Sequence, residues 1–284
     1  MLAYSCLADF FNEYVQIGES TAIESLKHFC DAVIETQYLR KPNTNDRGFP
    51  EMLGSLDCMH WHWKNCPTAW HGTHTNGFKK VPTLILEVVT SQDLWICYVF
   101  FGMAGTNNDI NVLDGSPLFD DLINESVPPY DFVVHGYQYN IGYYLSDGIY
   151  PSYATLIQTI SQPISIKEKL FAERQEVVRK DMEQAFGVLQ SRWHIVKGPA
   201  HMWNVKDLGK IMKTCIILHN MIIDSEHHQG INPESWEPHT DEMVDQVDIE
   251  HDYTFHVSKM INRMKQVQNT RRHKDLKMDL INHL

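Results

Sequence analysis

Three acidic residues occupy positions from which their carboxylates could share one chemical task. Asp57 in GSLDCMHW and Asp147 in YYLSDGIYP each follow a short apolar, strand-like segment, and Glu183 lies in a helical stretch 36 residues after Asp147. Strand ends of α/β sheets converge at one edge, so we expect these side chains to meet there. Converging carboxylates repel one another unless cations neutralise them, and their hard oxygen atoms suit Mg²⁺ or Mn²⁺.

Two such ions, about 4 Å apart, would activate a water or a 3′-hydroxyl and stabilise the leaving oxygen during in-line displacement at phosphorus. The same residues also allow a purely structural interpretation. In that interpretation Asp57 and Asp147 are turn residues, and Glu183 pairs with Arg179 across one helical turn. The spacing alone leaves both interpretations open.

The elements that must position these acids follow from the hydrophobic pattern. Residues 20–38 predict a helix with Ser20 or Thr21 as its N-cap. Residues 53–57 predict a short strand that ends at the acid, and residues 83–89 and 94–101 predict a hairpin. From about residue 166 the apolar period becomes helical, while 225–250 predicts a loop or disordered segment. The pattern indicates an α/β protein.

Charge is distributed in blocks along the chain. The net charge of −12 argues, taken whole, against nucleic acid as a partner, because phosphate binding needs cations. Residues 81–166 contain no Lys or Arg and carry −9, whereas residues 167–215, around Glu183, carry +4. Residues 216–257 carry −10 and residues 258–284 carry +5. We therefore expect the helix of Glu183 to supply a local positive surface.

Other features narrow the class of protein. No run of 18 uncharged apolar residues exists, so we expect no membrane span. The six cysteines are scattered without a CxxC pair, which favours a reducing, intracellular compartment.

The chain resembles the PIF/Harbinger superfamily of DDE transposases, in its plant-type branch. The resemblance covers roughly residues 11–226, and its motifs occur in the family's order and spacing. The matching segments are YLRKPN, GSLDCMHWHWKNCPTAWHG, PTLILEVV, DLWICYVFFGMAGTNNDINVLDGSPLF, QYNIGYYLSDGIYP, RKDMEQAFGVLQSRW and CIILHNMIIDSE.

This resemblance implies an RNase H-like catalytic domain, a mixed sheet flanked by helices. Its DDE triad would be Asp57, Asp147 and Glu183, with Mg²⁺ or Mn²⁺ as cofactor. The implied activity is cutting and joining of DNA phosphodiester bonds at transposon ends and target DNA, in the nucleus. Family members work with a separate Myb/SANT-like DNA-binding protein, which would suit an acidic chain, and a homo-oligomer is compatible with this activity.

The resemblance also sets the expected domain boundaries. Residues 1–42 would be a helical remnant of a truncated helix-turn-helix, 50–224 the endonuclease domain, and 225–284 an acidic, flexible tail with a basic helical end. The intact triad favours a metal-dependent nuclease. The short N-terminal region favours the alternative, a domesticated or decayed derivative that acts as a non-catalytic chromatin or protein-interaction module.

Several polar residues near the triad have more than one interpretation. A zinc site is conceivable from six residues within a short stretch, although their spacing lacks a zinc-knuckle pattern. Some of the same imidazoles could instead contact phosphate or orient metal ligands. Asp109 is expected to fix a helix start, with a ligand role for Asp109 and Asp114 as the alternative. The six zinc candidates are Cys58, His60, His62, Cys66, His71 and His74, and the candidates for DNA contact are His60, Lys64, Arg179, Lys180 and Arg192.

Overall fold

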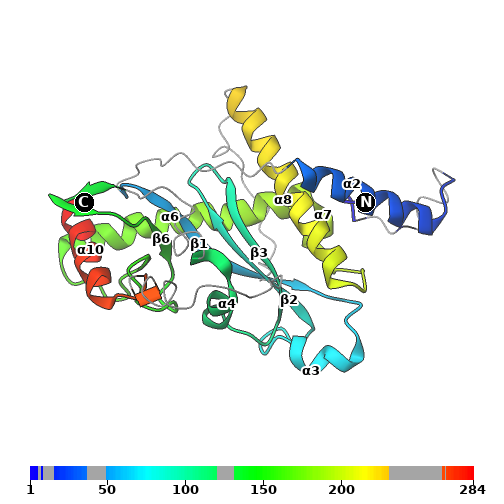
Figure 1. The fold of residues 1–284 in the computed structure, drawn as a ribbon, viewed down its shortest axis with the longest axis horizontal. Helices are drawn as coiled ribbons and strands as arrows, with labels where there is room; N and C mark the ends of the chain where they lie inside the picture. Colours follow the sequence, from blue (N-terminus) through cyan, green and yellow to red (C-terminus); the bar gives the residue numbers. More distant parts are fainter. Residues whose placement is uncertain (6–7, 9–15, 37–48, 120–130, 230–263, 266) are drawn as a thin grey trace.

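A five-stranded mixed sheet lies at the centre of the computed structural model, which describes residues 1–5, 8, 16–36, 49–119, 131–229, 264–265 and 267–284. The strand order is β3-β2-β1-β6-β7, and Figure 1 shows β1, β2, β3 and β6 around the centre of the molecule. β1 pairs antiparallel with β2, and β2 with β3, whereas β1–β6 and β6–β7 are parallel. The strands are β1 (Met52–His62), β2 (Thr83–Thr90), β3 (Ile96–Ala104), β6 (Tyr143–Ser146) and β7 (Leu156–Gln158).

The predicted hairpin of β2 and β3 is confirmed. β2 is buried along its whole length, as expected for a continuous apolar strand that is covered on both faces. The prediction of a short strand ending at Asp57 is wrong. β1 continues to His62 because β2 keeps pairing with it, up to the pair His62–Thr83.

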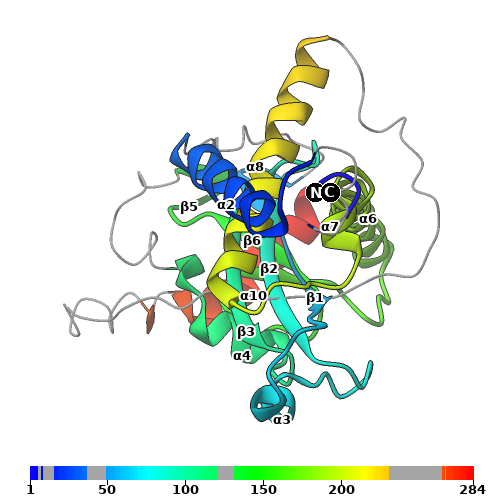
Figure 2. The same ribbon diagram turned by 90° about the vertical axis from the view of Figure 1, so that its right-hand side faces the viewer.

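Helices flank the sheet. α6 (Ile166–Arg192) packs against β1, β2 and β6, and α8 (Val205–His228) packs against β3 and α2 (Glu19–Glu35). Figure 2 shows the ribbon from the side, with α6 separated from α2 by the other elements. The shorter helical elements are η1 (Thr68–Trp70), α3 (His71–His74), α4 (Asp109–Gly115), η2 (Pro117–Phe119), α7 (His194–Lys197) and α10 (Thr270–His283).

The helix ends follow local sequence signals, with one correction. α6 begins with a capping box, in which the Ser165 hydroxyl accepts from the Glu168 N–H and the Glu168 carboxylate accepts from the Ser165 N–H. The N-cap predicted for α2 at Ser20 or Thr21 is wrong. The helix begins one residue earlier, after Gly18, which makes no side-chain cap bond.

A second, smaller core joins the end of the chain to the sheet. The hairpin of β4 (Phe132–Val134) and β5 (Tyr137–Tyr139) and the helix α10 pack over β6, β7 and α6. α10 buries Leu276, Leu280 and Ile281 there, and Figure 1 shows it in red beside β6. The basic helical end expected of the tail is thus a packed helix. The loop predicted from residue 225 is wrong at its start, because α8 continues to His228, and residues 230–263 of the predicted tail lie outside the described residues.

Across the described part of the chain, no helix combines the length and the apolar character that crossing a membrane requires.

Candidate active site

The register of the sheet brings two of the three predicted acids onto neighbouring segments of the chain. Ser55 of β1 pairs with Leu145 of β6 in the parallel ladder. Asp57 follows two residues later within β1, and Asp147 follows two residues later, directly after the end of β6, so the two acids lie at the same level of neighbouring segments. Asp57 lies mid-strand in β1, at the point where β6 stops, and not at a strand end as expected.

Asp57 is a partly buried carboxyl group whose pKa departs from its ordinary value. Burial raises its pKa to about 7, and the carboxylates of Asp109 and Asp147 add to this rise. The N–H of Cys58 donates to Asp57 Oδ1 at 2.7 Å, and this bond and the charge of Arg179 oppose the rise. A cation bound beside Asp57 would favour its ionised form.

Asp147 lies in a turn, and its charge also acts on Asp57. Its Oδ1 accepts a 2.8 Å hydrogen bond from the N–H of Ile149, which is the turn role. Its charge nevertheless acts on Asp57. The turn therefore fixes the carboxylate next to its neighbour on β1.

Glu183 is less closely associated with the other two acids. It is exposed on α6, and its Oε1 lies 3.9 Å from Arg179 Nη2, the ion pair expected across one helical turn. Arg179 thus lies close enough to act on both Asp57 and Glu183. Among the described residues, no three His, Cys, Asp or Glu side chains form a group that could hold a metal ion.

Two further acids contribute to the electrostatics of this region. Asn108, not Asp109, caps α4 by accepting from the Asn111 N–H at 2.9 Å, so Asp109 is the first helical residue and its charge reaches Asp57. Sequence reasoning missed Glu87, which is fully buried in β2 and accepts a hydrogen bond from Ser116. Burial raises the pKa of Glu87 to about 8. The sequence feature that could have revealed this residue is a single acid within the apolar run TLILEVV.

The candidates for DNA contact separate into surface and interior groups. Lys64 and Lys180 are exposed, and Arg179 is half-buried beside Glu183. His60 is buried, and burial lowers its pKa to about 4. Arg192 binds both carboxylate oxygens of Glu226 at 2.6 and 2.7 Å, which ties α6 to α8 and neutralises the charge expected to face DNA.

The zinc interpretation is not supported in the described part of the chain, where no group of metal-binding side chains forms. The Cys58 thiol lies 3.0 Å from the Tyr150 hydroxyl instead. His60 bonds to Thr83 Oγ1 at 2.7 Å and accepts from Asn76 Nδ2 at 2.7 Å. These partners explain the polar residues without a metal.

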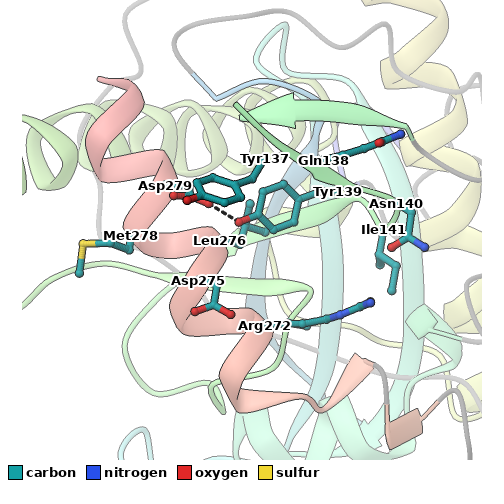
Figure 3. A pocket seen from close by; sticks show the side chains of 11 residues that line it. Tyr137, Gln138, Tyr139, Asn140, Ile141, Arg272, Asp275, Leu276, Met278 and Asp279 are labelled. Atoms are coloured by element: carbon teal, nitrogen blue, oxygen red, sulfur yellow. Dashed lines mark hydrogen bonds between the residues drawn. The ribbon is translucent and has the colours of Figure 1, made fainter. Parts of the chain in front are cut away.

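A cavity of about 470 Å³ lies elsewhere, between the β4–β5 hairpin and α10. Figure 3 shows Tyr137, Tyr139 and Arg272 around it, with Tyr139 donating to Asp279 at 2.5 Å. None of the predicted catalytic acids lines this cavity. It is therefore separate from the candidate active site.

These observations define an α/β domain with a mixed sheet, in which one carboxyl group lies in β1 and a second lies directly after the neighbouring parallel strand β6. The family model described as plant transposon protein matches residues 35–230, and the chain belongs to this family, of PIF/Harbinger-type transposase-derived proteins. It is 26% identical over 187 residues, 63% of its length, to "Protein ALP1-like" of Arabidopsis thaliana. The match spans 45% of that relative, less than half of its length. No solved structure matches the chain.

Proposed function

We propose that the chain is a metal-dependent DNA endonuclease of the DDE type, acting in the nucleus on transposon ends and target DNA. The observation that supports this proposal is the parallel pair Ser55–Leu145, because Asp57 and Asp147 each follow it by two residues and the charge of Asp147 acts on Asp57. The strand order and directions also support an RNase H-like fold for residues 50–224, with α2 belonging to a helix-turn-helix remnant. A Myb/SANT-like partner and homo-oligomerisation remain part of the proposal.

The residues present fit Mg²⁺ or Mn²⁺ in part. Asp57 and Asp147 offer adjacent hard oxygen ligands, and Glu183 would complete the set after releasing Arg179. When bound, the ions supply the positive charge that stabilises in-line displacement at phosphorus. Until then, Arg179 partly balances the negative charge of Asp57 and Glu183.

A paired assay tests this proposal. Mn²⁺ binding is followed by calorimetry, and nicking of supercoiled plasmid is followed in Mg²⁺ or Mn²⁺. The wild type is expected to bind and to nick, whereas Asp57→Asn should lose at least about 100-fold in nicking, because ligand removal disables the charge stabilisation. Glu24→Gln, which removes the charge of an exposed acid of α2, is the control and should behave as wild type.

A second function is favoured by the ion pair of Glu183 with Arg179, which leaves the three acids ungrouped in the described structure. It is a non-catalytic, domesticated role as a chromatin or protein-interaction module. If wild type and Asp57→Asn are equally inert and neither binds Mn²⁺, the nuclease proposal fails and this second function stands.

A further inference from the structure

Two stretches of the chain that lack acidic residues come together at one end of the sheet. The segment 63–82 connects β1 to β2, and the segment 197–204 connects α7 to α8. Together they contain four lysines and no Asp or Glu, in a chain whose net charge is −12. We call these two segments the acid-free lobe, and Figure 1 shows its helix α3 at the end of the sheet remote from α10.

Main-chain and side-chain bonds hold the two segments of the lobe together. Trp63 and Ala200 form a parallel bridge, and the Lys64 N–H donates to the Ala200 carbonyl at 3.0 Å. Trp63 Nε1 donates to the Met202 carbonyl at 2.8 Å, and Asn65 Nδ2 to the His201 carbonyl at 2.5 Å. The lobe is therefore a built surface in which residues distant in sequence have fixed relative positions.

The tip of the lobe presents an aromatic side chain to solvent. Asn76 Oδ1 accepts from the N–H groups of Phe78 and Lys79, both at 2.8 Å, which closes a tight turn. The other end of the Asn76 amide donates to the buried His60, so the turn is fixed to the core. Phe78 is 91% exposed at the apex of this turn. The large apolar ring of Phe78 is thus exposed to water on a turn that hydrogen bonds of Asn76 join to the core.

The lobe exposes a second ring and carries exposed cations. Trp203 is 69% exposed in the other segment, and Trp70 lies half-exposed with its ring stacked on His74. Lys64 and Lys80 are exposed. Burial lowers the pKa of His62, and the neighbouring His201 and Lys64 add to this effect. Aromatic rings among lysines are the combination that binds single-stranded nucleic acid.

The lobe is joined to the candidate active site. Trp63 lies six residues beyond Asp57 along the direction of β1, which corresponds to about 20 Å of extended chain. Thr106, in the loop that leads to Asp109, donates its hydroxyl hydrogen to the Thr73 carbonyl of the lobe at 2.7 Å. A DNA end that reached Asp57 could therefore extend over the lobe.

We propose that the acid-free lobe binds unpaired bases of DNA beside the active site. Lys64 and Lys80 contact phosphates, and Phe78 and Trp203 stack on bases that have left the duplex. The inference rests on the proposed function for its choice of DNA, and it adds a substrate form, a DNA end with an unpaired tail. Charge complementarity supports the choice, because the lobe carries four lysines and no acid in a chain whose net charge is −12.

The test is a binding assay without divalent metal. Anisotropy of a labelled duplex with a 3′ single-stranded tail is compared, in EDTA, with that of a blunt duplex and of a tailed RNA duplex. The wild type is expected to prefer the tailed DNA. Phe78→Ala and Trp203→Ala should each weaken binding to the tailed DNA about tenfold and leave the blunt duplex nearly unchanged.

Charge and control variants sharpen the test. Lys80→Ala should weaken both duplexes and lower the slope of log affinity against log salt by about 0.7–0.9. Tyr137→Ala on β5 and Lys213→Ala on α8 remove an exposed aromatic ring and an exposed cation outside the lobe, and both should bind as wild type. Thermal melts confirm that each variant is folded.

The outcomes separate this inference from the proposed nuclease activity. Asp57→Asn should keep the tail preference in EDTA while losing nicking, so a nuclease failure leaves the binding result readable. The inference is overturned if Phe78→Ala and Trp203→Ala bind the tailed DNA as wild type does. A wild type that shows no preference for the tail, or that prefers the tailed RNA, overturns it as well.

Discussion

Asp57 carries a carboxyl group that changes its charge near neutral pH, because it is buried beside other acids. Its pKa is about 7, against an ordinary value of 3.8. Between these values the folded protein binds a proton that the unfolded chain does not. Folding is therefore penalised increasingly as the pH rises from about 4 to about 7, and the penalty is constant above that range.

The change Asp57→Asn should remove this penalty, because the amide keeps the size of the side chain and an oxygen that can accept from the Cys58 N–H. The variant should be more stable than wild type by about 2–4 kcal/mol at pH 8 and nearly equal at pH 4. Urea unfolding at both pH values measures this difference. The exposed Asp114→Asn should show no such pH dependence, and a constant difference for Asp57→Asn would refute the burial argument.

At the scale of elements, an irregularity in β1 sets the position of Asp57. The pairing of β1 with β6 shifts between Met52 and Gly54, so the strand gains a residue before the pair Ser55–Leu145. Gly54 has φ of +147°, and a Cβ there would lie 2.5 Å from Val89 Cγ1 and 2.6 Å from the Thr90 carbonyl oxygen. Since side chains alternate between faces, the shift decides which face carries the carboxylate.

Gly54→Ala should therefore destabilise the domain by about 2–4 kcal/mol, through backbone strain and contact with β2. Chemical unfolding measures the loss. Gly72→Ala is the matched control, because a Cβ at that glycine meets nothing within 4 Å, and its stability should change by less than about 1 kcal/mol. Equal stability of the two variants would show that the irregularity is not needed.

The sequence predicted the elements with strong periodicity better than it predicted their contacts. The β2–β3 hairpin and the helical period from about residue 166 are confirmed, since runs and periods are local properties. The extent of β1 depends on pairing with β2, which no local pattern contains. Likewise the ion pair of Arg192 joins two helices through Glu226, a partner 34 residues away. Partner choice of this kind is a property of the packed structure.

At the scale of the whole molecule, acidic residues are absent from the lobe at one end of the sheet. The acid-free lobe lies at one end of the sheet, while α10 and the second core occupy the other. The candidate active site lies between them on β1 and β6. This separation lets an acidic chain offer a local cationic surface, which orients a polyanion that the net charge alone would repel.

Packing of α10 should contribute to the stability of the entire domain, because its apolar face completes a core shared with the sheet. Leu280 is fully buried there, so Leu280→Ala should cost about 2–4 kcal/mol. Met278, exposed on the same helix, supplies the control, and Met278→Ala should cost less than about 1 kcal/mol. Thermal unfolding followed by far-UV circular dichroism compares them. Equal melting curves would mean that α10 is not part of the cooperative unit.

The second core has a consequence for biosynthesis. Phe49 and Ile281 both belong to this core, although they are far apart in sequence and are synthesised at different times. A nascent chain that ends before α10 has already made β4, β6 and β7, whose apolar side chains then lack their cover. Contacts between residues so far apart in sequence slow folding, and they leave aggregation-prone apolar surface exposed during translation. We therefore expect the growing chain to depend on chaperones until α10 is released.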